Sequence, residues 1–229
     1  MIYHSPAKKI DGFNELKVRN LSIKRVSDTI YLGLHLDDQL KWDKHVNHVC
    51  NGLAKNFHVF YNIRNCLNDE LKKQLYYSLV YSRIQYGVEI YGGCRESLMR
   101  RVQVVQNKLL KVLFDLPMRT NTNILHSRLK ILKVKDIYNI QVTKFVYESL
   151  NQLSIAQFHN HFKYRSTIHR HDTRNQNDLY PKKVRTAYGE STIHNKGTKL
   201  WNGLCPKIKA SKSLYTFKKT LKAKILTYY

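Results

Sequence analysis

The stretch that decides the fold is Thr29-Ile-Tyr-Leu-Gly-Leu-His-Leu-Asp-Asp-Gln-Leu-Lys-Trp-Asp-Lys-His45. Apolar residues alternate with other residues over positions 29–36, and a period of two predicts a strand. Positions 37–39 carry the Asp and Gln side chains that are typical of a turn. From Trp42 the period becomes helical, with apolar residues at Trp42, Val46, Val49, Leu53, Phe57 and Phe60. The stretch therefore predicts a strand, a turn and a long amphipathic helix over positions 42–63.

The charge of the chain restricts its possible partners. Its 229 residues include 40 Lys and Arg against 16 Asp and Glu, which gives a formal net charge of +24. Such a field attracts polyanions, either nucleic acid or an anionic membrane surface. No apolar run approaches the roughly twenty residues that a membrane span needs. We therefore expect RNA and/or DNA, bound through phosphates, and we expect neither a membrane nor a small-molecule substrate as partner.

The cysteines and the first residues indicate the compartment. Cys50, Cys66, Cys94 and Cys205 are far apart and form no Cys-x-x-Cys pair, so they predict reduced thiols and no redox or zinc site. The first residues, Met-Ile-Tyr-His-Ser-Pro, lack the charged-then-apolar pattern of a secretory signal. Both observations favour an intracellular protein, cytoplasmic or nuclear.

Helical segments are expected along most of the remaining chain. Asn68 or Asp69 can cap a helix that ends near position 85, with Leu71, Leu75, Leu79 and Ile84 on its apolar face. Ser97 is expected to cap the next helix, which must stop before Pro117. Two further helices are expected over 123–132 and 136–153, followed by a basic loop region over 154–198. Position 91 and the two glycines after it are interpreted as a loop.

Two helices are expected to present basic outward faces. In the helix that begins near Ser97, the cations off the apolar face are Arg100, Arg101, Lys108 and Lys111. The last helix is expected to follow Ser213 as its cap, with Leu214, Phe217, Leu221 and Ile225 pointing inward. Its outward lysines are Lys218, Lys219, Lys222 and Lys224. Because no acidic residue occurs after Glu190, these cations are predicted to contact nucleic-acid phosphates.

Two motifs resemble a known family. Tyr31-Leu32-Gly33, followed by Asp37, Leu40, Trp42 and His45, resembles the signature of reverse transcriptases from non-LTR (LINE-like, jockey-type) retrotransposons. In that family the signature lies where the palm passes into the thumb, close to the primer grip. The segment 197–206, Gly-Thr-Lys-Leu-Trp-Asn-Gly-Leu-Cys-Pro, resembles a motif near the end of such proteins, with Cys205 inserted before the proline.

The resemblance implies a domain order and an activity. It implies the end of a palm over 1–40, a helical thumb-like domain over 41–153 and a basic carboxyl-terminal extension over 154–229. The fold class is thus mainly α with a small β element. The family synthesises DNA on RNA with magnesium, and Tyr31, Leu32 and Gly33 would lie near the primer terminus. Its catalytic carboxylates lie upstream of this signature, so we expect no catalytic residue and no cofactor in this fragment, and no activity of the fragment alone.

Several alternatives remain open at this point. Asp37 and Asp38 could hold metal, but turn and helix-start roles fit their setting better. The pairs His159/His161 and His169/His171 could ligate zinc, contact phosphate or lie on the surface. Tyr31-Leu32-Gly33 could be purely structural. The whole chain could also be a basic nucleic-acid-binding helical protein retained by a host, or a degenerate transposon reading frame without function.

Overall fold

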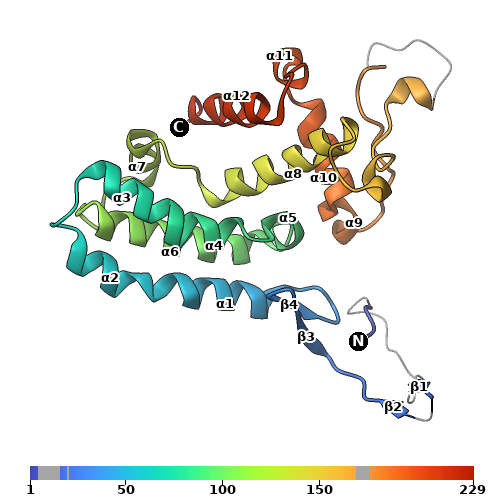
Figure 1. Ribbon diagram of the computed structural model, residues 1–229, viewed down its shortest axis with the longest axis horizontal. Coiled ribbons are helices and arrows are strands. Elements are labelled where there is room, and N and C mark those ends of the chain that lie inside the picture. The colour runs from blue at the N-terminus through green and yellow to red at the C-terminus, as the bar shows by residue number, and fades with distance from the viewer. Residues whose placement is uncertain (5–15, 20, 169–175) are drawn as a thin grey trace.

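The computed structural model describes residues 1–4, 16–19, 21–168 and 176–229. Within them the chain is mainly helical, with two small antiparallel hairpins near its amino terminus (Figure 1). The first hairpin pairs β1 (Leu16–Val18) with β2 (Leu21–Ile23), and the second pairs β3 (Asp28–Tyr31) with β4 (Leu34–Asp37). The expected class, mainly α with a small β element, is confirmed.

The strand predicted over 29–36 is wrong, because the chain reverses in its middle. Leu32 and Gly33 both have positive φ, 47° and 76°, as in the two-residue turns that match the twist of paired strands. The register pairs Tyr31 with Leu34, so Ile30 points to the opposite face from Leu34. Leu34 is buried, whereas Ile30 and Leu32 are exposed. The apolar alternation in the sequence thus runs across a turn, and the apolar residues before and after this turn lie on different faces of the hairpin.

The long helix predicted over 42–63 is present as two consecutive helices. They are α1 (Asp43–Ala54) and α2 (Asn56–Ile63), and Lys55 between them keeps right-handed helical angles. Trp42 precedes α1 with a left-handed φ of 69° and is buried. The expected apolar stripe faces the core, with Val46, Val49, Leu53 and Phe60 buried and Phe57 packed against them.

The next helical stretch contains a π-helical turn. The order is α3 (Asp69–Tyr76), the π-helix η1 (Tyr77–Tyr81) and α4 (Ser82–Gln85). Asn68 caps α3 as expected, since its side chain accepts a hydrogen bond from the Leu71 amide at 2.9 Å. The predicted inward positions of Leu71 and Leu79 are wrong. The buried face runs through Lys72, Tyr76 and Val80, each one position after an apolar residue that was expected to point inward. Ile84 is buried as predicted, together with two residues outside the predicted apolar face, Tyr76 and Val80.

The middle of the molecule consists of four further helices. They are α5 (Val88–Tyr91), α6 (Glu96–Leu113), α7 (Thr122–Leu129) and α8 (Val134–Leu150). Two local predictions are wrong. Tyr91 ends α5 and is buried instead of lying in a loop. The helix α6 starts at Glu96, with Arg95 in the N-cap position, and no side chain caps it. Tyr138 and Val142 of α8 are buried, and Phe145 and Leu150 pack against the core.

The loop predicted over 154–198 is only partly irregular. It holds short 3-10 turns, η2 (Ala156–Phe158) and η3 (Arg165–Thr167), but helical structure begins with α9 (Ala187–Ser191) and α10 (Ile193–Asn202). The chain continues through α11 (Pro206–Lys209) to α12 (Leu214–Leu226), which Ser213 caps as predicted by accepting from the Thr216 amide at 3.2 Å. Gly197 lets α10 lie close to α8, because a Cβ at this position would approach Cγ2 of Val146 to 2.7 Å.

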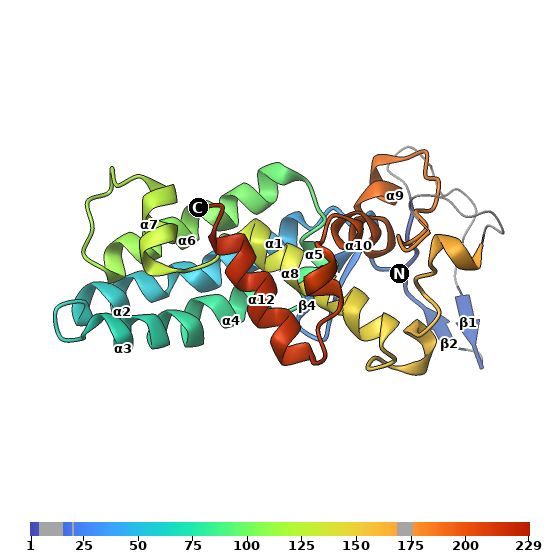
Figure 2. The same ribbon diagram turned by 90° about the horizontal axis from the view of Figure 1, so that it is seen from above.

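The described helices share one core. The Phe217 ring of α12 stacks on Tyr147 of α8 at 4.5 Å and lies 6.0 Å from Trp201 of α10. Buried residues from Leu34 to Leu221 form one apolar cluster, so the carboxyl-terminal helices pack on the middle helices (Figure 2). The domain boundaries at 40 and 153 stay predictions. Within the described residues, no helix has both the length and the apolar character needed to cross a membrane.

Candidate nucleic-acid interface

The tip of the β3–β4 hairpin is exposed but fixed in place. The Tyr31 and Leu32 side chains are 63% and 71% exposed. The Tyr86 hydroxyl, at the end of α4, donates a hydrogen bond to the Leu32 carbonyl at 2.6 Å, and Gly33 lies against the Tyr86 ring. The turn residues are thus positioned by the helical body while their side chains face solvent. This arrangement suits contact with a partner.

The turn after β4 is held by the Asp37 carboxylate. Its Oδ1 accepts from the amides of Gln39 and Lys41 at 3.1 and 3.0 Å, and its Oδ2 accepts from the Trp42 amide at 3.0 Å. The Asp38 carboxylate lies 3.5 Å from Nε2 of His4. Both oxygens of Asp37 therefore serve the backbone, in a turn where Leu40 and Trp42 have positive φ. The arrangement is that of a turn residue, which is the role that the sequence favoured.

His45 connects the hairpin to the first helix. It is buried, its Nδ1 accepts from the His35 amide at 3.4 Å, and its ring lies 4.6 Å from that of Tyr91. Burial, together with the nearby His35 and His48 rings, lowers the pKa of His45 to about 4. His45 is therefore a neutral core residue at physiological pH, and its place in the motif is explained by packing.

The four cations predicted on α6 do not share one surface. Arg100 and Lys108 are exposed, and Arg101 is exposed but donates to the Asn47 side chain of α1 at 2.6 Å. Lys111 is buried, and its Nζ donates to the Met118 carbonyl at 2.7 Å. The outward placement of Lys111 is wrong, because its flexible stem folds back to hold the chain after α6.

The lysines of α12 match the prediction more closely. Lys218 and Lys219 are exposed, and Lys222 and Lys224 are half-buried. Within the described part of the chain, no carboxylate forms an ion pair with any of these four lysines. Lys222 differs from the others, since its Nζ donates to the Tyr77 hydroxyl at 3.1 Å and lies over that ring. Three lysines are thus available to meet an anion, and Lys222 is partly engaged in holding α12 on η1.

A second group of cations was missed from the sequence. Burial, followed by the proximity of Lys135 and Lys199, lowers the pKa of Lys196. Lys135 lies on α8, whereas Lys196 and Lys199 lie on α10, and these two helices pack together. Like charges brought together by the fold favour an anion between or beside them. Only the packing of α10 on α8 reveals this group, since Lys135 lies 61 positions before Lys196 in the sequence.

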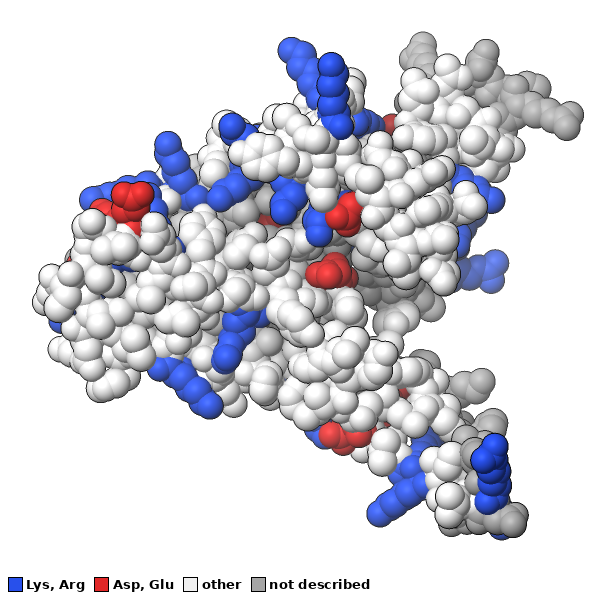
Figure 3. All heavy atoms as spheres, viewed as in Figure 1, with Lys and Arg blue, Asp and Glu red and all other residues white. Residues whose placement is uncertain are grey.

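The predicted contacts lie on different sides of the molecule. α6 packs against α1, α2 and α8, whereas α12 packs against α8 and α11, so α8 lies between the two sets of cations. Figure 2 shows α12 crossing over α8. On the face in Figure 3, Lys and Arg side chains project along the upper edge, where Figure 1 places α11 and α12, and Asp and Glu occur only in small groups.

Metal ligation by the histidine pairs gains no support from the described residues. His159 Nε2 meets the Ser154 carbonyl at 2.6 Å, and His161 packs among the rings of Phe145, Phe158, Phe162 and His194. The pair His169/His171 lies outside the described residues. Within the part of the chain that the structure describes, no group of three or more His, Cys, Asp or Glu side chains could hold a metal.

Comparisons with known proteins give two relatives, both from Drosophila melanogaster. A probable RNA-directed DNA polymerase from transposon X-element is 28% identical over 119 residues, which cover 50% of this chain and 13% of the relative. A probable RNA-directed DNA polymerase from transposon BS is 23% identical over 124 residues, which cover 53% of this chain and 14% of the relative. No family model matches the chain. No solved structure matches it either.

The matched segment is a small part of each relative. It covers about half of this chain, whereas it spans only 13% and 14% of the two polymerases. The two similarities support a region related to transposon reverse transcriptases over about half of the chain.

Proposed function

We propose that this chain is the palm end, thumb and carboxyl-terminal extension of a non-LTR retrotransposon reverse transcriptase. In this proposal it binds template and primer, and it lacks the aspartates that catalyse polymerisation. The observation that carries the proposal is the similarity to two transposon RNA-directed DNA polymerases over about half of the chain. The resemblance of Tyr31-Leu32-Gly33 to the family signature supplies the finer assignment, and magnesium would belong to the complete enzyme.

The hairpin tip is proposed to lie near the primer terminus. Its exposed residues, Tyr31 and Leu32, are held in place against the helical body by the hydrogen bond from the Tyr86 hydroxyl to the Leu32 carbonyl. A rigid, exposed turn positions a strand end better than a mobile loop, because little ordering entropy is lost on contact. Gly33 allows the positive φ of the turn, where its backbone lies against the Tyr86 ring.

The lysines of α12 are proposed to contact the phosphate backbone. Lys218, Lys219 and Lys224 carry no ion pair within the described residues, so binding a phosphate there breaks no existing salt bridge. Lysines are point charges on flexible stems, and they position a backbone without reading bases. Binding should therefore show little sequence preference and should weaken steeply as salt is added.

The test compares two triple substitutions that remove the same charge. One variant carries Lys218→Gln, Lys219→Gln and Lys224→Gln on α12. The control carries Lys44→Gln, Lys144→Gln and Lys209→Gln, three lysines that are paired with Asp28, Glu148 and Asp178. Affinity for an RNA–DNA hybrid is measured by fluorescence anisotropy over a range of salt concentrations.

The two variants should behave differently. The α12 variant should lower the slope of log affinity against log salt by up to roughly 0.7–0.9 for each phosphate that it no longer neutralises, and its affinity should fall by similar factors for unrelated sequences. The control should keep the slope, since its ammonium groups already face carboxylates. Equal slopes in the wild type and the α12 variant would show that these lysines are only a solvated surface.

A further inference from the structure

A groove of about 970 Å³ lies between the amino-terminal turn and the carboxyl-terminal helices. One wall is the turn from β4 to α1, the floor is α5 and the residues after it, and the other wall is α9 with the start of α10. Segments more than 140 positions apart in the sequence, such as Lys41 and Tyr188, therefore line the same space. No prediction from the sequence included this groove.

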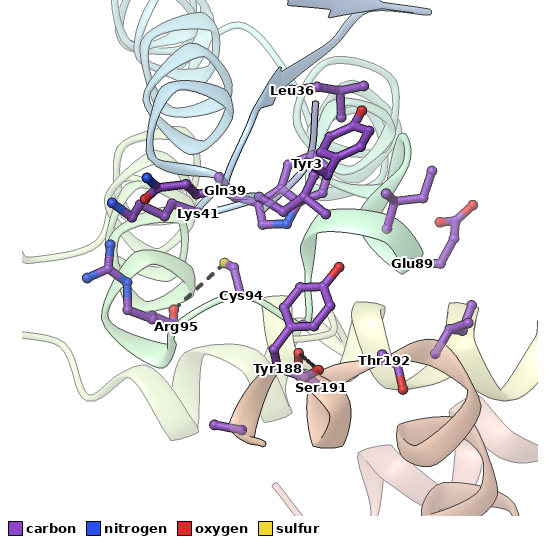
Figure 4. A pocket seen from close by; sticks show the side chains of 16 residues that line it. Tyr3, Leu36, Gln39, Lys41, Glu89, Cys94, Arg95, Tyr188, Ser191 and Thr192 are labelled. Carbon is purple, nitrogen blue, oxygen red and sulfur yellow. Dashed lines mark hydrogen bonds between the residues drawn. The ribbon is translucent and has the colours of Figure 1, made fainter. Parts of the chain in front are cut away.

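Two tyrosines dominate its walls. Tyr3 is 52% exposed and Tyr188 is 60% exposed, and both contribute to the lining. Figure 4 shows the Tyr188 ring projecting from α9 into the space, with Tyr3 and Leu36 on the far side. The remaining lining combines aliphatic side chains with polar and charged ones, and it includes Ile90, itself 54% exposed. Flat aromatic rings on an apolar surface are suited to stacking against another flat ring.

The charged residues of the groove are unevenly placed. Lys41 and Arg95 lie together at one end, and Glu89 lies at the other (Figure 4). Arg95 contacts Asp43 at 2.9 Å, but the Arg95 side chain is 65% exposed, and a surface ion pair of this kind contributes little stability. The guanidinium and the Lys41 ammonium can therefore bind a phosphate at little cost to the stability of the fold.

We propose that this groove binds a segment of single-stranded RNA or DNA. In this arrangement bases stack on Tyr188 and Tyr3, and the backbone phosphate lies at the end formed by Lys41 and Arg95. A duplex would not fit this role, because its bases stack on each other and expose no free face. The inference rests on the proposed function in requiring that the chain binds nucleic acid, and it adds a separate site for unpaired nucleotides.

The test replaces the aromatic ring of Tyr188 with an apolar side chain that cannot stack on a base. Tyr188→Leu should weaken binding of a short fluorescent oligouridylate, which remains single-stranded, by about tenfold, as expected for the loss of one stacked base. Tyr188→Phe should bind within about twofold of the wild type, since stacking needs only the ring. Because Tyr188 is mostly exposed, both variants should fold, and circular dichroism checks this.

The matched control is Tyr61→Leu. Tyr61 has the same exposed fraction, 60%, but lies on α2, at the opposite end of the molecule from α9 (Figure 1). This variant should bind the oligouridylate as the wild type does. A photoreactive 4-thiouridine oligonucleotide should also crosslink to peptides that contain Tyr3 or Tyr188, located by mass spectrometry.

Binding of an RNA–DNA hybrid distinguishes this inference from the proposed function. Tyr188→Leu should bind an RNA–DNA hybrid as tightly as the wild type, because the hybrid is proposed to use the α12 lysines. If Tyr188→Leu binds oligouridylate normally while hybrid binding remains salt-dependent, the groove is not a nucleotide site and fits a protein segment instead. If the wild type binds neither probe, both the groove and the proposed function are wrong.

Discussion

The amino-terminal turn and the carboxyl-terminal helix are ordered by different forces. Residues 28–42 hold few buried side chains, and polar contacts fix their path, chiefly the three backbone amides that donate to Asp37. The helix α12 is ordered by its apolar face, where Phe217 and Leu221 are buried against α8. The turn is specified by individual hydrogen bonds and backbone angles, whereas α12 is specified by a repeated pattern.

This difference determines what each region can tolerate. Apolar burial is roughly additive and non-directional, so α12 should accept changes on its outward face. The turn depends on residues with positive φ, including Leu40 and Trp42, and on particular atoms of Asp37. We therefore expect single substitutions to have larger effects in the turn than on the outward side of α12.

The largest effect is expected for Trp42→Ala. Trp42 is 6% exposed and its ring packs edge-on against His45, so truncation should cost about 3–5 kcal/mol. The measurement is chemical denaturation, in which the midpoint should fall clearly. Trp42→Phe is the control and should retain most of the stability, because it keeps an aromatic ring in the same place. A silent Trp42→Ala would mean that the ring lies outside the core and is free to stack on a base.

A smaller effect is expected when His45 titrates. Its pKa is about 4 in the folded chain, below the usual value of 6.5, because burial favours the neutral ring. As pH falls from 6.5 towards 4, the unfolded chain gains a proton that the folded chain does not, and stability drops by up to about 1.4 kcal/mol per pH unit. Denaturation across this window should show the slope, and His45→Asn should reduce it by about one proton. An unchanged slope in that variant would place the effect on other groups.

The sequence predicted the pattern-driven parts of the fold well. The Ser213 cap and the buried residues Phe217 and Leu221 of the last helix follow from spacing alone, as does the stripe from Val46 to Phe60. Such stripes are readable because burial of one helix face depends on period and little else. The adjacent lysines Lys218 and Lys219 were predicted to point outward for the same reason, and both are exposed.

The failures occurred where geometry departs from a regular period. The turn at Leu32-Gly33 leaves the apolar alternation in the sequence unbroken but moves the residues after it to the other face of the hairpin. The sequence therefore predicted one strand where the structure has two. Along α3 and the π turn at Tyr77–Tyr81, the buried face runs through Lys72, Tyr76 and Val80, one position after Leu71, Leu75 and Leu79. Lys111 reached a distant carbonyl through its long stem, which no periodicity records.

The two candidate sites differ in the same way in how far the sequence predicted them. The α12 lysines were predicted from the sequence, since the outward face of an amphipathic helix follows from its period. The groove was not predicted, because Tyr3 and Tyr188 come to line one space only in the folded chain, where α9 packs on α10 and α10 packs on α8. Their signal in the sequence is weak: each is one of 16 tyrosines, and nothing local distinguishes them from core residues.

The smallest effect is expected for Tyr77→Phe, which tests whether Lys222 serves the fold of α12. The substitution removes the hydroxyl that accepts from Lys222 Nζ at 3.1 Å and keeps the ring beneath it. Loss of one such hydrogen bond should cost about 0.5–1.5 kcal/mol. The affinity for an RNA–DNA hybrid should not fall, because Lys222 becomes free to meet a phosphate. Lys222→Gln in the wild-type background should lower the salt slope less than Lys219→Gln does, since Lys222 contacts Tyr77 and Lys219 has no ion pair within the described residues. Equal slopes for the two variants would mean that the contact with Tyr77 does not hold Lys222 away from the phosphate, and that α12 acts as a uniform basic surface.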